Sequence, residues 1–276
     1  MDLTDLPKQH KETPGFLPAI PRHETFGFFM LMLSIWFLIL AFFHFFPQID
    51  IAATRIFFQE TECPKPAPAG ENCGFFPIST DPFFIVLRKI LFYVPAAAAL
   101  VLLGMLIFTV IKNGDESYRG RPAQQYSLSL LTLALGPYVL VNLIFKMFSG
   151  RPRPNDTDLF GGTHIFMPAG EFGGECPKNC SFVSGEAAGA GWVICLLPLI
   201  PKKLQPFLIP PVIAICIVTP ALRVFFGGHY LSDVILGWLS SIVLYAAVFS
   251  VANILEQRKF VSENIKNVLV PVAKSD

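Results

Sequence analysis

The residues most capable of chemistry in this chain are His229 and Asp233, which lie four positions apart near the start of an apolar segment. If they lie on one helix, both side chains are on the same face, and Asp233 can accept a hydrogen bond from one imidazole nitrogen. That bond would set the tautomer and leave the other nitrogen free as a nucleophile or base. A histidine at a span end can also be merely interfacial, but the acid and a nearby arginine favour catalysis.

Four basic side chains interrupt apolar stretches: Lys146, Arg151, Arg153 and Arg223. Gathered at one depth of a membrane, they would repel one another unless an anion bound among them. A guanidinium matches phosphate oxygens with a planar fork, and an ammonium adds a point charge. Arg151 is equally compatible with a position at the lipid interface, where its charge reaches the headgroups.

A third polar cluster, CSFVSGEAAGAG, begins at Cys180. Ser184 and Gly185 at a helix start would offer unpaired N–H groups and a dipole that favours an anion. They could equally form an ordinary helix N-terminus, with Ser184 as the N-cap and Glu186 in the first turn. Both interpretations use the same donors and can hold together. The small residues that follow favour close helix packing.

The composition indicates what must position these clusters. Hydrophobic residues make up 53% of the 276 residues and charged residues 15%, against about 25% charged in a typical soluble domain. The mean hydropathy is +0.55, which excludes disorder. The 21 basic residues nearly cancel the 20 acidic ones, so nothing indicates nucleic-acid binding. The chain is therefore expected to be an integral membrane protein whose main partner is the lipid bilayer.

We expect an all-α integral membrane protein with six transmembrane helices, because a span needs about 20 mostly apolar residues. The first segment is too long for the apolar core of a signal peptide, so it is expected to be retained. The organisation is then a cytoplasmic arm (1–25), a six-span domain (26–255) and a cytoplasmic tail (256–276) that forms a short helix or stays loose. The expected spans are residues 26–46, 83–111, 126–148, 182–200, 207–222 and 231–255.

The orientation follows from Lys and Arg, which divide twelve to nine between the two sides. The bias sharpens when the four basic site candidates are set aside. Both termini are then cytoplasmic, the loops 47–82 and 149–181 face outward, and the three polar clusters lie near the outward membrane face.

The cysteines agree with this topology, because two close pairs fall in the outward loops, where disulfides persist. The alternative for the second pair is metal binding, but no His or further Cys completes a tetrahedral set nearby. No metal or cofactor is expected. The disulfide candidates are Cys63, Cys73, Cys176 and Cys180.

These clusters, in this order, resemble the type-2 phosphatidic acid phosphatase superfamily of membrane lipid phosphatases, whose motifs are K-x6-R-P, P-S-G-H and S-R-x5-H-x3-D. The resemblance covers roughly residues 83–255. Two positions of the second motif and one of the third depart from it: Val183 replaces Pro, Glu186 replaces His and Leu222 replaces Ser. The matching residues are Lys146, Arg153, Pro154, Ser184, Gly185, Arg223, His229 and Asp233.

The resemblance implies a metal-independent phosphatase that acts through a phosphohistidine. His229 would attack phosphorus, and Asp233 would orient and stabilise it. The motif spacing selects Arg153 rather than Arg151 as a phosphate ligand. The expected phosphate-binding groups are Lys146, Arg153, Arg223, Ser184 and the Gly185 N–H.

In the family, the histidine of the second motif protonates the leaving oxygen, and this chain has Glu186 there. A partly buried carboxyl group beside an anion holds its proton more tightly, so Glu186 could be the general acid. Two alternatives stay open. Glu186 could orient another group while His164 donates the proton, or the protein could bind phosphate with little turnover.

The expected substrate is a lipid phosphate at the membrane surface, with the 28 phenylalanines available to accommodate its tails. The long loop 155–179 could contact a hydroxyl-rich headgroup, and the chain looks most like the bacterial lipid A phosphatases. Phosphatidylglycerol phosphate, undecaprenyl diphosphate and phosphatidic acid stay open as substrates, as does a catalytically weak lipid-binding protein. A transporter would spread its charges through the membrane depth, whereas here they cluster at one end. The oligomeric state is not indicated.

Overall fold

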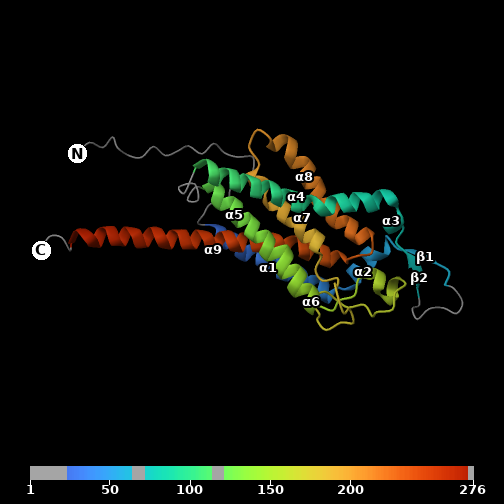
Figure 1. Cartoon of the computed structure of the whole chain (residues 1–276). Coiled ribbons are helices and arrows are strands. Elements are labelled where there is room, and N and C mark those ends of the chain that lie inside the picture. The colour runs from blue at the N-terminus through green and yellow to red at the C-terminus, as the bar shows by residue number, and fades with distance from the viewer. Residues whose placement is uncertain (1–23, 64–71, 114–120, 273–276) are drawn as a thin grey trace.

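A computed structural model of the chain describes residues 24–63, 72–113 and 121–272 (Figure 1). The described part contains five helical segments that are long and apolar enough to cross a membrane. The prediction of a helical multi-pass protein is therefore confirmed, whereas nearly all of the N-terminal arm (1–25) lies outside the described residues. The five segments are α1 (Thr25–Phe45), α4 (Pro82–Asn113), the continuous run α5 (Arg121–Leu133), η3 (Ala134–Phe145) and α6 (Lys146–Phe148), α8 (Gln205–Phe225), and α9 (Leu231–Val272).

The expected fourth span is a shorter, central helix. α7 (Gly185–Cys195) has 11 residues and is followed by the 3-10 turn η6 (Leu197–Leu199). At about 1.5 Å per residue it is much shorter than a hydrocarbon core of about 30 Å. A Cβ atom at Gly191 would collide with the carbonyl oxygen of Trp238, so only glycine allows this close approach to α9. The prediction of a full span over 182–200 is wrong in length, because small residues bury α7 among its neighbours.

Two other helix ends differ from prediction. α8 extends beyond the expected 207–222, and its internal prolines do not end it, since neighbouring helices can satisfy freed backbone groups in a membrane. α9 continues as one 42-residue helix through most of the expected tail. The division at residue 255 stays a prediction.

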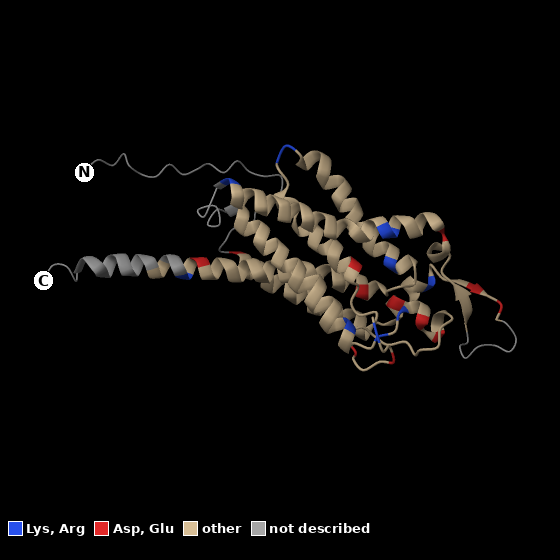
Figure 2. Cartoon of the chain, viewed as in Figure 1, with Lys and Arg blue, Asp and Glu red and all other residues tan. Residues whose placement is uncertain are grey.

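One end of the bundle, called here the hairpin end, carries the short elements and, among the described residues, most of the charged ones (Figures 1 and 2). An all-α prediction omits the small antiparallel sheet there, in which Gln59 pairs with Phe75 and Thr61 with Cys73. Disulfides join Cys63 to Cys73 beside this sheet and Cys176 to Cys180 in the loop after α6. The hairpin end comprises α2 (Gln48–Arg55), β1 (Gln59–Thr61), β2 (Cys73–Phe75), α3 (Pro77–Thr80), η4 (Pro154–Asp156), η5 (Asp158–Phe160) and the loops between them.

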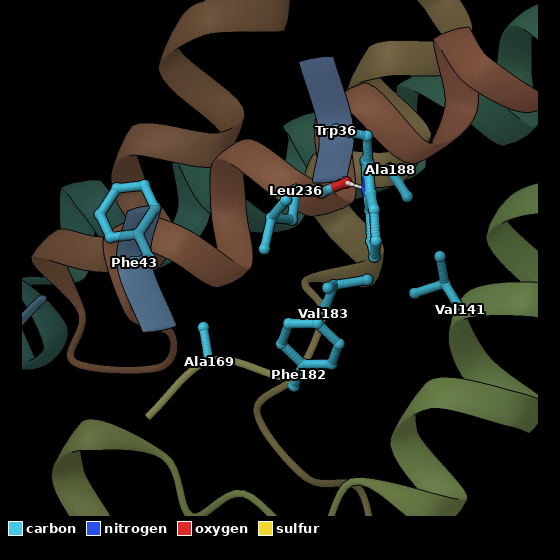
Figure 3. Packing of buried hydrophobic residues seen from close by; sticks show 8 residues of the cluster. All are labelled: Trp36, Phe43, Val141, Ala169, Phe182, Val183, Ala188 and Leu236. Carbon is cyan, nitrogen blue, oxygen red and sulfur yellow. Dashed lines mark hydrogen bonds between the residues drawn. The ribbon is translucent and has the colours of Figure 1, made fainter. Parts of the chain in front are cut away.

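A buried apolar cluster supports the hairpin end from inside the bundle (Figure 3). Trp36 of α1 packs there and donates its indole N–H to the Leu236 carbonyl at 3.1 Å and to Ser240 Oγ at 3.0 Å. Phe182 and Val183 belong to the same cluster and directly precede Ser184. The packing thus holds α1, α9 and the start of α7 in one fixed arrangement beneath the polar clusters.

Candidate active site

His229 lies in the short loop between α8 and α9 and is 2% exposed. Its Nδ1 is 2.8 Å from the carbonyl oxygen of Ser181. Because a carbonyl oxygen can only accept a hydrogen bond, Nδ1 must carry the proton. Nε2 then keeps its lone pair and is the nitrogen available as a nucleophile.

Asp233 is close to His229 but does not hydrogen-bond to it, so the prediction of a direct bond is wrong. The distance from His229 Nδ1 to Asp233 Oδ2 is 3.9 Å. The physical reason is that α9 begins only at Leu231, so the two residues do not share a helix face. Asp233 Oδ2 instead accepts the Tyr230 N–H at 3.1 Å and the Ser181 hydroxyl at 2.5 Å.

Three cationic side chains lie close enough to the His229 imidazole to lower its pKa. Burial and the positive charges of Arg223, Arg153 and Lys146 hold the pKa of His229 well below its ordinary value of 6.5. Each of these influences disfavours the imidazolium form. The histidine is therefore neutral at pH 7, which is the form that a nucleophile requires.

Two of these cations donate to Asn179, which lies in the loop before α7. Arg153 donates to the Asn179 carbonyl from Nε at 3.2 Å and from Nη2 at 3.1 Å. Lys146 donates to Asn179 Oδ1 at 3.3 Å. A Cβ atom at Gly185 would lie 3.5 Å from the Lys146 ammonium nitrogen, so glycine leaves that charge close to the start of α7.

Arg223 is almost fully buried, yet its Nε has no hydrogen-bond partner among the described residues. Its guanidinium lies against Gly228, where a Cβ atom would come within 2.6 Å of Nη2. A buried donor without a partner is costly unless a ligand satisfies it. This geometry fits a phosphate oxygen.

A cavity of about 410 Å³ opens beside these groups. Three guanidinium groups line it, those of Arg88, Arg153 and Arg223, and Arg88 also lies over the Phe226 ring. The remaining wall comes from the segment of β2 and α3, from the segment that follows α6, and from the loop between α8 and α9. These wall residues are Gly74, Phe75, Phe76, Ser79, Asn155, Phe160, Gly161, Phe226 and Gly228.

Ser184 is the N-cap of α7, and its side chain accepts the Ala187 N–H at 3.4 Å. Its own N–H donates to the Asp233 carbonyl at 3.0 Å. A Cβ atom at Gly237 would lie 2.5 Å from the Ser184 carbonyl oxygen, so α9 packs closely on the start of α7. The helix terminus that could bind an anion is thereby fixed against the helix that carries Asp233.

Glu186 is held by an arginine that the sequence analysis did not assign to the site. Arg88 donates to both carboxylate oxygens, from Nη2 at 2.5 Å and from Nε at 3.2 Å. Arg223 Nε lies 3.5 Å from Oε1 of the same carboxylate. His164, the other candidate proton donor, pairs with Glu175 at 3.3 Å in the loop and does not line the cavity.

Comparisons with known proteins show the family to which the chain belongs. Residues 126–256 match the PAP2 superfamily. The chain is also 46% identical over 243 residues to a protein of Rhizobium etli named lipid A 4'-phosphatase, covering 88% of this chain and 94% of that protein. The chain belongs to the PAP2 superfamily. A second similar PAP2 relative, the Rhizobium leguminosarum protein of the same name, is 44% identical over 83% of this chain and 98% of its own.

The fold was also matched to a solved PAP2 structure. This is the crystal structure of a transmembrane PAP2-type phosphatidylglycerolphosphate phosphatase from Bacillus subtilis. The TM-score is 0.46 and the identity 15%, over 80% of this chain and 93% of that one.

Within this PAP2 chain, Arg151 is not at the lipid interface, which was one of its two expected positions. It is fully buried, with Nη1 2.6 Å from Asp233 Oδ1 and Nη2 2.9 Å from Asp50 Oδ2. Arg153, two residues later, lines the cavity instead. The motif spacing that favoured Arg153 therefore agrees with the geometry.

Sequence reasoning missed Arg88, Asp50 and Ser181. Arg88 is recognisable in the sequence as a charge within the apolar segment 83–111, but its position there is equally typical of a residue that sets the membrane orientation. Asp50 follows the first span in no recognisable motif. Ser181 contacts His229 through its backbone carbonyl and Asp233 through its hydroxyl, and no residue pattern predicts either contact. Together, the site presents a neutral imidazole beside a cationic cavity, which is suited to displacement at phosphorus.

Proposed function

We propose that this protein removes a phosphate group from lipid A or a closely similar glycolipid. The observation that carries the proposal is the buried, neutral His229 beside a cavity lined by Arg88, Arg153 and Arg223. The two relatives named lipid A 4'-phosphatase, each covered over more than nine-tenths of its length, support the substrate class.

In the first step, the Nε2 lone pair of His229 attacks phosphorus. The N–P bond forms as the P–O bond to the sugar breaks, and the leaving oxygen departs with the bonding pair and takes a proton. Charge spread over the phosphoryl oxygens is offset by Arg153, Arg223 and Lys146. The Nε of Arg223, which makes no hydrogen bond and lies 3.5 Å from the Glu186 carboxylate, can donate to one of these oxygens.

In the second step, a water molecule attacks the phosphohistidine. The O–P bond forms, the N–P bond returns its electron pair to the imidazole, and inorganic phosphate leaves. Throughout both steps the Ser181 carbonyl holds the proton on Nδ1, so the ring cannot change tautomer. Asp233, 3.9 Å away, stabilises the positive charge that the ring acquires on phosphorylation.

Glu186 is proposed as the proton donor for the leaving oxygen. Its carboxylate is 10% exposed and shares two arginines with the cavity. A phosphate dianion entering the cavity competes with the Glu186 carboxylate for Arg88 and Arg223. Glu186 is thus released to donate a proton in the presence of substrate, and water returns that proton in the second step.

The cavity also suits the sugar next to the phosphate. Aromatic rings of Phe75, Phe76 and Phe160 form part of the wall, and Asn155 and Ser79 supply polar groups. A few placed polar groups among aromatic surfaces are typical of sites for small organic groups. The acyl chains would remain in the bilayer, since the spans carry many exposed apolar side chains.

The proposed location is a bacterial inner membrane, with the termini in the cytoplasm and the hairpin end in the periplasm. Two disulfides at the hairpin end support an oxidising compartment on that side. Most charged residues of the described part of the chain gather at the same end (Figure 2), as expected for a site that binds the phosphate of a lipid headgroup.

A second candidate is a catalytically weak lipid-phosphate-binding protein. One observation favours it: Glu186 stands at the motif position of the usual histidine and is engaged by Arg88. If that pair does not open, the cavity binds phosphate but the leaving oxygen has no proton donor.

The test uses the full chain purified in detergent. Lipid A, phosphatidylglycerol phosphate, undecaprenyl diphosphate and phosphatidic acid are offered separately, and products are followed by phosphate release and mass spectrometry. We expect loss of one phosphate from lipid A, inhibition by vanadate and no effect of a chelator. Release from another lipid alone would overturn the substrate class. Binding of lipid A with no release would establish the second candidate.

A further inference from the structure

Asp50 lies on α2, well before the region that matches the PAP2 superfamily, yet it reaches the candidate active site. It is fully buried. Its Oδ1 accepts the Ser232 N–H at 2.8 Å, and its Oδ2 accepts the Ser232 hydroxyl at 2.5 Å. Ser232 N–H belongs to the first turn of α9, where N–H groups have no partner within the helix. Asp50 therefore caps, from 182 residues away, the helix that carries Asp233.

The same carboxylate binds Arg151, which connects it to Asp233. Arg151 donates to Asp50 at 2.9 Å, to Asp233 at 2.6 Å and to the Ser232 hydroxyl at 2.9 Å. Its Nε donates to the Met167 carbonyl at 2.8 Å, and the guanidinium lies over the Tyr230 ring at 4.4 Å. All three nitrogens of the guanidinium donate hydrogen bonds, four in total, so its orientation is fixed.

The charges of this group do not cancel. Asp50 and Asp233 accept hydrogen bonds on both of their carboxylate oxygens, from Arg151 and from Ser181, Tyr230 and Ser232, and such a set of donors favours the ionised forms. Two negative charges then face the one positive charge of Arg151, and all three side chains are fully buried. Little solvent is present to screen the remaining negative charge. The other charged groups that face His229 are positive and come from different elements: Lys146 of α6, Arg153 of the following loop and Arg223 of α8, which Glu186 of α7 partly offsets.

We propose that Asp50 is a positioning residue of the phosphatase reaction, which fixes Arg151 and the start of α9 and leaves one net negative charge beside His229. The inference rests on the proposed function. Without Asp50, Arg151 would offset the whole charge of Asp233. The imidazole gains positive charge when it forms the N–P bond, so the residual charge stabilises that step rather than substrate binding.

The first test replaces Asp50 by asparagine, which keeps the shape and one acceptor oxygen. We expect kcat to fall by about tenfold or more and KM to change by less than about twofold. We also expect the acid limb of kcat/KM to move to lower pH, by roughly half a unit or more, because loss of a negative charge further lowers the pKa of His229. Titration of the substrate phosphate is common to both proteins and cancels in the comparison.

The pH of the acid limb of kcat/KM separates an electrostatic role of Asp50 from a merely structural one. A variant that folds poorly has fewer active molecules and a lower rate, but the surviving molecules keep the wild-type limb. Glu62→Gln is the matched control, since it removes an exposed carboxylate from the hairpin end. It is expected to leave kcat and the limb unchanged.

A charge-restoring variant sharpens the test. Asp50→Asn combined with Arg151→Gln again leaves one net negative charge, that of Asp233. We expect the acid limb of kcat/KM in the double variant to return to the wild-type pH. Asp50→Glu keeps the negative charge but moves it, and its acid limb should stay at the wild-type pH even if kcat falls. Asp50→Glu decides the matter if the double variant does not fold.

An unchanged acid limb in Asp50→Asn would overturn the inference, whether or not kcat falls. So would a limb displaced equally in Asp50→Asn and Asp50→Glu, since charge would then not be the cause. Failure of the proposed function is distinguishable, because it would show as the absence of lipid dephosphorylation in the unaltered protein.

Discussion

Arg151 and Arg153 are separated by one proline, yet they belong to two different regions of the hairpin end. Arg151 is fully buried and shares its guanidinium between Asp50 and Asp233. Arg153 borders the cavity and donates to a single backbone carbonyl, that of Asn179. The first region has its donors satisfied by the protein itself, and the second keeps donors available for a ligand. The partner groups, and not the residue type, decide whether an arginine stabilises the site or binds the substrate.

The largest expected effect lies where the two regions meet. His229→Gln should lower turnover by roughly 10⁴-fold or more, because no nucleophile remains to form the phosphoenzyme. Phosphate release from the lipid substrate measures the loss. Affinity for inorganic phosphate, measured in the same preparation, should persist because the cations remain. Substantial release by this variant would show that phosphorus is attacked by another group.

A matched pair of variants tests whether Arg151 stabilises the site while Arg153 binds the substrate. Arg153→Gln should lower kcat/KM by about 10²–10³-fold, the usual effect of losing one transition-state donor, and leave stability nearly unchanged. Arg151→Gln should destabilise the fold by about 3–5 kcal/mol, because two buried carboxylates lose their common partner. Thermal unfolding in detergent and initial rates are both measured. Equal effects of the two variants on stability would mean that the two regions do not differ as described.

Glu186→Gln should lower turnover of the lipid substrate by about 10²–10⁴-fold, the usual contribution of a general acid. The matched substrate is p-nitrophenyl phosphate, whose leaving group needs no proton, and its turnover should be nearly spared. Arg88→Gln serves as the control, because it removes the partner and keeps the acid. A similar loss on both substrates in Glu186→Gln would assign Glu186 to binding rather than to proton donation.

The smallest expected effect concerns the helix terminus between the two regions. Ser184→Ala removes the N-cap of α7 and should lower stability by about 1 kcal/mol. If the hydroxyl also donates to phosphate, KM for the lipid should rise by less than about tenfold. Ser184→Thr keeps the hydroxyl and should recover both quantities. A fall in stability with an unchanged KM would leave only the capping role.

Much of the fold could be predicted because its signals are local. The first span and the helix that begins at Pro82 follow from long, mostly apolar segments, the second of which Arg88 and Lys89 interrupt near its start. The predicted boundaries agree with the structure within a few residues. α7 was mispredicted because apolar composition does not distinguish a lipid-facing span from a central helix packed among others. The small β1–β2 sheet has too few residues to leave a periodic pattern.

The candidate site was predictable where motif spacing carried the information. Lys146, Arg153 and Arg223 come from three elements, and the structure places their charges around His229. The sequence could not tell whether His229 hydrogen-bonds to Asp233, because the answer depends on the residue at which α9 begins. One turn of helix decides whether residues four apart share a face.

The sequence by itself determined that this chain is a membrane protein and which residue types could bind a phosphate, since hydropathy and motif spacing are properties of neighbouring residues. Only the tertiary structure decided which charges are paired: Asp50 with Arg151, and Arg88 with Glu186. These partners are about 100 residues apart. Complete burial strengthens the pair of Asp50 and Arg151, whereas the Arg88 side chain is 34% exposed. Burial and contact between distant segments arise when helices pack, so no local pattern can report them.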